Sequence, residues 1–293
     1  MLTEEQLAHF KTFGFVVMRS VLTEDELKTI RSEFDHRAAE AFSFEPFDGS
    51  KRHTFNMMGH GTPFFASLME DPRFAETAEQ MYGDVLGRGS DGNRYVRNTF
   101  WHNDPVCPEA YGVKFAIYLQ RMRADNGSLR LIPGSHKGPW FDQLDERPPL
   151  RYAWVRKDYA RAEADDVVES IPGYACETDP GDVVAFNDRL YHASVGGPND
   201  RQQCDITYLK YPRTPQEVAA TISLAKDYMT ERDNSADPWN PRRTAPDEWL
   251  ANPDGNPLRQ RWIDGWKRFS EMNEGENGFK TVAIDGKLKM VPA

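Results

Sequence analysis

The chain has 293 residues, with 46 acidic against 36 basic side chains, a formal net charge of -10, and it is 39% hydrophobic and 12% aromatic. This length and composition predict a globular protein with one substantial domain and a real core, and the aromatic content argues against disorder. The negative charge disfavours a nucleic-acid-binding role, because such proteins need a basic face for the phosphates.

Sequence features also indicate the compartment. The N-terminus has neither the basic region nor the apolar run of a secretory signal, and no apolar run approaches the roughly 20 residues that span a bilayer. Three cysteines, Cys107, Cys176 and Cys204, are odd in number and lack metal-type spacing, which is typical of reduced thiols. We therefore expect a cytoplasmic protein without membrane segments.

Residues 1–92 predict helices and a loop. Two capping-box pairs begin helices in the stretch 3–40: Thr3 with Gln6, and Thr23 with Glu26. A short apolar run at 15–18 predicts a strand between these helices, and helical spacing of apolar residues returns at 63–82. Residues 41–62 lack periodicity and predict a loop.

The loop at 41–62 has two interpretations. In one it is only solvated. In the other it covers the mouth of an active site, where binding residues usually lie. Its segment 51–60 is dense in cations, imidazoles and amides, and it supplies candidate substrate residues: Arg52, His53 and Asn56. These side chains would suit a small polar or anionic molecule.

Residues 93–212 predict short strands separated by glycine and proline turns. Residues 113–120 alternate cleanly, with a set on one side that we expect to face a pocket: Lys114, Ala116, Tyr118 and Gln120. Further strands are predicted at 128–132, near 171, at 182–186, near 191 and at 203–211, with a polar insertion at 137–168. Helices at the front and many short strands behind them predict one mainly β domain, a sandwich or jelly roll with helical decoration.

Residues 213–293 are rich in proline, tryptophan and charge, and we expect them to cover the β-core because they are too few for a generous core of their own. A helix is predicted at 257–272, with one apolar face: Trp262, Trp266 and Phe269. Asp285-Gly286 would turn a final hairpin. Together with segment 51–60, the tail is expected to close the mouth through some of its tryptophans: Trp239, Trp249, Trp262 and Trp266. The alternative is that these tryptophans only fasten the tail to the core.

The motif Trp101-His102-Asn103-Asp104 carries the strongest chemical signal. On an extended backbone His102 and Asp104 project to the same side, because side chains alternate with period two. His192, just after the predicted strand at 182–186, offers a third ligand. Two histidines and one carboxylate with open positions are typical of non-haem Fe(II) oxygenases.

Around these residues the chain resembles the phytanoyl-CoA dioxygenase-like family of Fe(II)- and 2-oxoglutarate-dependent oxygenases. The segments that carry the resemblance are 101–104, 125–137, 180–186 and 191–194, with Arg201 beyond them. The resemblance extends over most of the predicted β-core and the N-terminal helices, but the tail is not covered. It implies a double-stranded β-helix core and oxidation by O2 coupled to decarboxylation of 2-oxoglutarate.

The resemblance also implies roles for single residues. His102, Asp104 and His192 would hold Fe(II). Arg201 matches the arginine that pairs with the far carboxylate of 2-oxoglutarate, which its planar fork suits. Ser194 matches a hydroxyl that supports the same carboxylate.

Other side chains are expected near the co-substrate. Asn98 shares strand phase with His102 and either points at 2-oxoglutarate or is a core-edge amide. An aromatic that is often tryptophan in the family is missing from the strand after the His102 and Asp104 motif, where Ala116 and Tyr118 lie. Tyr118 is expected to line the pocket, and the alternative is that it only packs. Lys114 is an alternative partner for a carboxylate. Related halogenases have glycine or alanine at the position of Asp104, so this carboxylate favours hydroxylation or a related oxidation such as desaturation.

Three function classes follow. The favoured one is an Fe(II)- and 2-oxoglutarate-dependent dioxygenase that hydroxylates an aliphatic carbon of a small polar metabolite and releases succinate and CO2. A Zn-dependent cupin-type hydrolase or isomerase is the alternative; it would need neither Arg201 nor Ser194, and metal-dependent O2 uptake discriminates between the two. A non-enzymatic jelly-roll binding module would not explain three ligands with open positions. The sequence does not indicate an oligomeric state.

Overall fold

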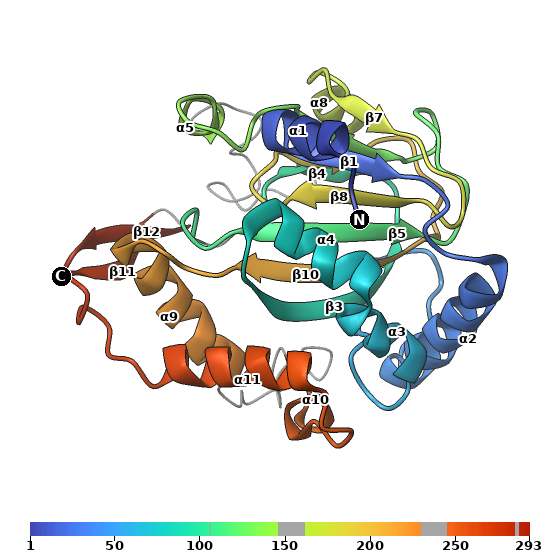
Figure 1. Cartoon of the computed structure of the whole chain (residues 1–293). Helices are drawn as coiled ribbons and strands as arrows, with labels where there is room; N and C mark the ends of the chain where they lie inside the picture. Colours follow the sequence, from blue (N-terminus) through green and yellow to red (C-terminus); the bar gives the residue numbers. More distant parts are fainter. Residues whose placement is uncertain (106, 146–161, 230–244, 285–286) are drawn as a thin grey trace.

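A computed structural model describes residues 1–105, 107–145, 162–229, 245–284 and 287–293 of the chain (Figure 1). The described helices are α1 (Glu4–Phe13), α2 (Glu24–Ala41), α3 (Pro63–Ser67), the 3-10 helix η1 (Leu68–Glu70), α4 (Pro72–Tyr82), α5 (Trp140–Asp145), α8 (Asp165–Val168), α9 (Pro215–Met229), α10 (Asp247–Ala251) and α11 (Pro257–Ser270). The described strands are β1 (Phe15–Met18), β2 (His53–Asn56), β3 (Val85–Tyr95), β4 (Thr99–His102), β5 (Gly112–Tyr118), β6 (Leu129–Leu131), β7 (Tyr174–Cys176), β8 (Val183–Asn187), β9 (His192–Ser194), β10 (Arg201–Lys210), β11 (Phe279–Ile284) and β12 (Lys287–Pro292).

Two antiparallel sheets make the body of the protein. The larger sheet has the strand order β1-β8-β5-β10-β3-β2, and the smaller one has the order β4-β9-β6-β7. Strands that are far apart in the sequence are neighbours in both sheets, and β4 and β9 are one example. The helices lie outside the sheets (Figure 1). The prediction of a mainly β fold with a double-stranded β-helix (jelly-roll) core and helical decoration is confirmed.

Apolar side chains fill three layers. The first lies between the sheets and includes Phe15, Leu129, Leu131, Val184 and Phe186. The second lies between the outer face of the larger sheet and the helices, with Phe34, Phe74, Phe115, Ile206 and Trp262 among its members. The third covers the outer face of the smaller sheet, and Trp101, Phe141, Val168 and Tyr191 belong to it. Part of the space between the sheets is left to polar side chains, and the functional site lies there.

The N-terminal helices begin where the sequence predicts. The hydroxyl oxygens of Thr3 and Thr23 accept backbone N–H groups at the starts of α1 and α2, and both capping boxes are complete. Gly14 ends α1 with a φ of 87°, and a Cβ there would lie 2.5 Å from the His136 ring. A glycine is therefore required by conformation and by packing.

Strand β2 lies inside the segment 41–62, which was predicted to be a loop, and it pairs with β3. Its four residues are too few for an alternating pattern to be recognised. Strand β3 begins at Val85, earlier than predicted, because its glycines disguise it. A Cβ on Gly92 would lie 2.4 Å from the Phe55 ring, so this glycine lets β2 and β3 pack closely.

The C-terminal tail packs on the outer face of the larger sheet, on the side away from the smaller sheet (Figure 1). The Trp262 ring occupies the space above Gly87, where a Cβ would lie only 2.5 Å away. The indole N–H of Trp266 donates to the Gly87 carbonyl oxygen at 2.8 Å, and Trp249 is buried in the same layer. The prediction that tail tryptophans close the mouth is wrong for these three, which fasten the tail to the core. Trp239 lies outside the described residues.

Two finer predictions for the tail are confirmed. Helix α11 buries all three aromatic side chains of its predicted apolar face. Strands β11 and β12 form the predicted hairpin, with Ile284 opposite Lys287. The turn residues Asp285 and Gly286 lie outside the described residues, as does 146–161 within the predicted insertion.

Candidate active site

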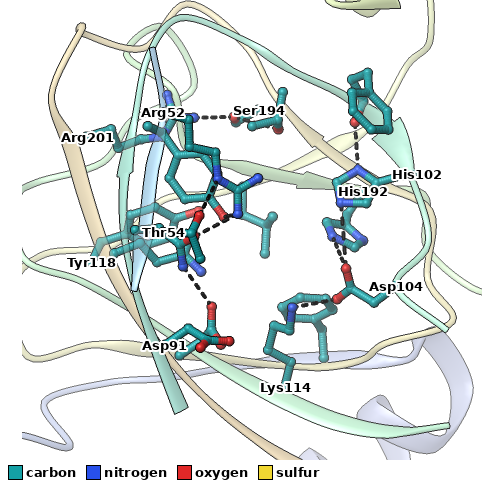
Figure 2. Close-up of a pocket in the computed structure, with 18 of the residues that line it drawn as sticks. Arg52, Thr54, Asp91, His102, Asp104, Lys114, Tyr118, His192, Ser194 and Arg201 are labelled. Carbon is teal, nitrogen blue, oxygen red and sulfur yellow. Dashed lines mark hydrogen bonds and ion pairs between the residues drawn. The ribbon is translucent and has the colours of Figure 1, made fainter. Parts of the chain in front are cut away.

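Three predicted metal ligands converge at the rim of the space between the sheets (Figure 2). His102 ends β4 and pairs directly with His192, which begins β9. The Nε2 atom of each histidine lies 3.6 Å from Asp104 Oδ1, and the three donor atoms all lie within 4.8 Å of one another. The local motif and the distant histidine are thus brought together.

Backbone carbonyl groups orient both imidazole rings. His102 Nδ1 lies 2.8 Å from the carbonyl oxygen of Phe100, and His192 Nδ1 lies 2.9 Å from that of Leu190. A carbonyl oxygen can only accept, so in the neutral ring Nδ1 carries the hydrogen and Nε2 keeps its lone pair. Such outer contacts fix the tautomer of metal-binding histidines.

Burial and local charge prepare these groups for a cation. Burial, helped by repulsion from His192, lowers the pKa of His102 to about 3, and burial also lowers the pKa of His192. Burial opposes ionisation of Asp104, but the Lys114 ammonium, 2.8 Å from its Oδ2, and the two histidines together outweigh this and hold the pKa of Asp104 below its ordinary value. At neutral pH the site therefore offers two neutral nitrogens and one carboxylate, the protonation states that a metal needs.

The donor set fits a divalent metal with open coordination positions. We find no other such group of three among the described histidine, cysteine and acidic residues. Lys114 engages Oδ2 of Asp104, which leaves Oδ1 to face the two imidazoles. Three ligands on one side would leave further positions for a co-substrate and O2.

Arg201 is a buried cation on the same cavity. It begins β10, is 1% exposed, and its guanidinium donates to Ser194 Oγ at 2.6 Å and to the Arg97 carbonyl oxygen at 3.1 Å. Its Nε atom has no partner among the described residues. Ser194 Oγ also lies 2.9 Å from Thr99 Oγ1. A buried guanidinium with an unused N–H suits a carboxylate ligand.

Two glycines make room for this guanidinium. A Cβ on Gly197 would lie 1.8 Å from an Arg201 nitrogen, and one on Gly127 would lie 2.7 Å from it. The Lys114 ammonium is instead held by Asp104, on the other side of the cavity in Figure 2. Arg201 is therefore the better placed of the two for the far carboxylate of 2-oxoglutarate.

Tyr118 and Asn98 have different surroundings. Tyr118 is 2% exposed and lines the cavity beside Arg201, and burial raises its pKa. The Asn98 amide donates to the Glu163 carbonyl oxygen and to Asp165, and its oxygen accepts the Gly196 N–H at 2.8 Å. The nitrogen and the oxygen of the Asn98 side chain are thus both used in contacts with neighbouring segments. Asn98 is therefore the core-edge amide, and we no longer count it among the residues that bind 2-oxoglutarate.

The predicted substrate residues divide between the two faces of β2. Arg52 lines the cavity, and its guanidinium donates to Asn93 Oδ1 at 2.7 Å. His53 stacks on Phe42 on the opposite face, with ring centroids 3.7 Å apart. The Asn56 side chain accepts the Met58 N–H and does not line the cavity. Period-two alternation places His53 in the core, and Asn56, although it shares the alternation phase of Arg52, does not line the cavity. His53 and Asn56 therefore leave the substrate set.

A cavity of about 280 Å³ lies between the metal ligands and the larger sheet, and a second of about 950 Å³ adjoins it at the mouth. The cavity of about 280 Å³ has a wall on the larger sheet, and this wall carries four polar side chains that no sequence motif indicated: Asp91, Asn93, Gln203 and Asp205. For Gln203 and Asp205 the signal was a polar residue at every second position of the buried strand that begins with Arg201. We call these four residues the polar wall.

Residues 10–203 match one protein family, described as Phytanoyl-CoA dioxygenase (PhyH). The chain belongs to the phytanoyl-CoA dioxygenase family. It is therefore an oxygenase of the iron- and 2-oxoglutarate-dependent class, as the resemblance implied, and the zinc hydrolase or isomerase alternative is set aside.

Several known proteins are similar in sequence. The ectoine dioxygenase of Sphingopyxis alaskensis is 23% identical over 233 residues, which are 71% of this chain and 76% of that protein. The ectoine dioxygenase of Bordetella bronchiseptica is 26% identical over 156 residues, 46% of this chain and 50% of that protein. The L-proline trans-4-hydroxylase of Streptomyces griseoviridis is 29% identical over 126 residues, 40% and 47% of the two chains. The chain thus spans about half the length of the last two.

Solved structures share the fold. HygX from Streptomyces hygroscopicus, with nickel and 2-oxoglutarate bound, has a TM-score of 0.54 at 22% identity, over 71% of this chain and 87% of that one. EctD from S. alaskensis, in its apo form, has a TM-score of 0.51 at 21% identity, over 71% and 76%. Among the described residues no helix has both the length and the apolar character needed to cross a membrane.

Proposed function

We propose that the chain hydroxylates an aliphatic carbon of a small polar metabolite, with Fe(II), 2-oxoglutarate and O2. The observation that carries the proposal is the set of two oriented Nε2 atoms and one carboxylate within 4.8 Å, on the same cavity as a buried arginine whose Nε–H has no partner among the described residues. Fe(II) with 2-oxoglutarate supplies O2 activation, and the protein supplies position and exclusion of water.

In this proposal the smaller sheet and Arg201 hold the cofactors. His102, Asp104 and His192 bind Fe(II), and the Lys114 ion pair restricts Asp104 to one coordinating oxygen. Arg201 and Ser194 take the far carboxylate of 2-oxoglutarate. Tyr118 lines the same part of the cavity and can orient that carboxylate through its hydroxyl group.

The substrate occupies the remaining cavity. The whole cavity measures about 280 Å³ and would also hold 2-oxoglutarate, so the space left for the substrate suits a small metabolite rather than a long acyl chain, and the wall on the larger sheet is polar. Relatives named ectoine dioxygenase and L-proline trans-4-hydroxylase are consistent with a small polar substrate. Arg52 lies where the cavity meets the mouth and is the proposed entrance residue.

Metal binding and turnover test this proposal directly. We expect one Mn(II), used as a stable substitute for Fe(II), to bind per chain in electron paramagnetic resonance titrations. His102→Ala, Asp104→Ala and His192→Ala are each expected to weaken binding more than 100-fold, because even outer-sphere changes cost about 10–100-fold. His36→Ala, which changes an exposed histidine of α2 outside the cavity, is the matched control. Unchanged Mn(II) affinity in the three variants, or no succinate from Fe(II), O2 and 2-oxoglutarate across a metabolite panel, contradicts the proposal.

A further inference from the structure

The polar wall places two carboxylates side by side. Asp91 on β3 is the direct cross-strand partner of Asp205 on β10, and both line the cavity. Like charges directly opposite one another destabilise a sheet. The pair therefore needs a reason other than the stability of the fold.

Neither carboxylate forms an ion pair with a described residue. Asp205 is 4% exposed and accepts one hydrogen bond, from Asn93 Nδ2 at 3.2 Å. The nearby Lys114 ammonium is held by Asp104, and Arg52 donates to neutral groups, the Asn93 oxygen among them. Burial raises the pKa of both Asp91 and Asp205, that of Asp205 to about 7. An added cation would relieve this cost.

Two buried amides on the same cavity also lack partners. Gln203 is 6% exposed, lies between Asn93 and Tyr118 in the sheet register, and no described residue bonds to its side chain. Asn103 is 3% exposed, lines the cavity, and its Nδ2 has no partner among the described residues. Buried amides are ordinarily hydrogen-bonded, so these two indicate a ligand with polar groups of its own.

We infer that the substrate carries a protonated amine, which Asp91 and Asp205 bind by charge and Gln203 orients by a hydrogen bond. This inference rests on the proposed function, since the cation would hold a nearby carbon opposite the metal ligands. An ammonium group has three donors, and the two carboxylates and the Gln203 oxygen are three acceptors. Arg201 and Asp205 are four residues apart on one strand, about 13 Å, so the anchors for 2-oxoglutarate and amine do not compete.

The experiment compares amines with their uncharged counterparts. The full chain is loaded anaerobically with Fe(II) and 2-oxoglutarate, and 1,4-diaminobutane, L-lysine and D-glucosamine are each titrated against their N-acetyl derivatives. Binding is followed by the visible absorption of the complex and by thermal stabilisation. At least one amine is expected to bind about 30-fold more tightly than its derivative, equivalent to about 2 kcal/mol.

Substitutions in the polar wall test whether it causes the preference for amines over their N-acetyl derivatives. Asp91→Asn with Asp205→Asn is expected to weaken amine binding about 30-fold, to change the Kd for 2-oxoglutarate less than twofold, and to raise the melting temperature because the repulsion is gone. Asp254→Asn, on the exposed turn after α10, is the control. The inference is overturned if no amine binds, if the acetylated partners bind equally well, if the variants bind amines as the wild type does, or if Mn(II) titration shows a second metal that the variants lose.

Failure of this inference differs from failure of the proposed function. Loss of the amine preference with intact Fe(II) and 2-oxoglutarate binding rejects only the ammonium site. Absence of Fe(II) or 2-oxoglutarate binding rejects the proposed function. In that case thermal stabilisation by amines still shows whether the polar wall binds them.

Discussion

The two walls of the cavity are built in different ways. The wall on the smaller sheet positions His102 and His192 through the carbonyl oxygen two residues before each histidine. The wall on the larger sheet positions Asp91, Gln203 and Asp205 mainly through the pairing of β10 with its two neighbours, β3 and β5. The first arrangement is encoded locally, and the second depends on strand register.

This difference has a functional meaning. A metal and a shared co-substrate need the same donors in every relative, and a local motif preserves their geometry when the rest of the chain changes. A substrate needs a wall that can change, and alternate positions of a long strand can change without disturbing the fold. We therefore expect variants of the first wall to abolish the chemistry and variants of the second to change which molecule is accepted.

The largest effect after loss of a metal ligand is expected from Arg201→Ala. Removing one partner of a buried charge pair costs about 2–5 kcal/mol, so the KM for 2-oxoglutarate should rise at least about 30-fold while the KM for the prime substrate changes little. Arg94→Ala, which breaks a more exposed ion pair with Asp200, is the control. A defect in Lys114→Ala that is missing in Arg201→Ala would show that the carboxylate partner is misassigned.

Lys114→Met tests the contact that joins the two walls. Lys114 belongs to the larger sheet, but its ammonium lies 2.8 Å from Asp104 Oδ2. Without it the carboxylate loses a partner that holds its orientation, and Mn(II) affinity should fall about 10–100-fold. Lys210→Met, which removes the partner of Glu217 away from the cavity, should leave Mn(II) affinity unchanged. Equal affinities in wild type and Lys114→Met would show that the pair is only structural.

Much of the first wall could be predicted from the sequence. The His102 and Asp104 pair, His192 and Ser194 meet in the structure as the motifs implied, and Arg201 reaches Ser194 from the larger sheet. Capping boxes at α1 and α2 were equally readable, because caps are local. Local hydrogen bonds and short motifs can be recognised in the sequence without knowledge of the tertiary fold.

The second wall could not be predicted, for physical reasons. The Asp91 and Asp205 pair exists only because β3 and β10 are neighbours in a particular register. Strand β3 was partly hidden by glycines that the ring of Phe55 and the tail require. His53 was misplaced because strand β2 was not recognised, and one strand places adjacent residues on opposite faces.

A pH dependence sharpens the assignment of Asp205. An unfolded aspartate has a pKa of about 3.9, whereas burial, with repulsion from Asp91, raises the pKa of folded Asp205 to about 7. The folded state binds more protons at Asp205 between these values, so the contribution of Asp205 to stability is lost as pH rises from about 4 to about 7. Asp205→Asn should escape this loss.

The free energy of unfolding of Asp205→Asn minus that of the wild type should thus be on the order of 2 kcal/mol larger near neutral pH than at about pH 4. Urea unfolding at the two pH values measures it, with Asp254→Asn as the control. Parallel stability curves for wild type and Asp205→Asn would mean that Asp205 is ionised throughout.

The smallest effect on turnover is expected from Trp266→Phe, behind the larger sheet. The variant leaves the buried Gly87 carbonyl oxygen without its donor and should lower the free energy of unfolding by about 1–3 kcal/mol. Trp101→Phe is the matched variant, since its indole N–H donates to the Val168 carbonyl oxygen at 2.9 Å, next to His102. Both should lose similar stability in urea unfolding, but only Trp101→Phe should also weaken Mn(II) binding, because only that ring supports the wall that carries the metal ligands. If Trp266→Phe lowered kcat/KM as much as Trp101→Phe does, the tail would act as a substrate cover after all.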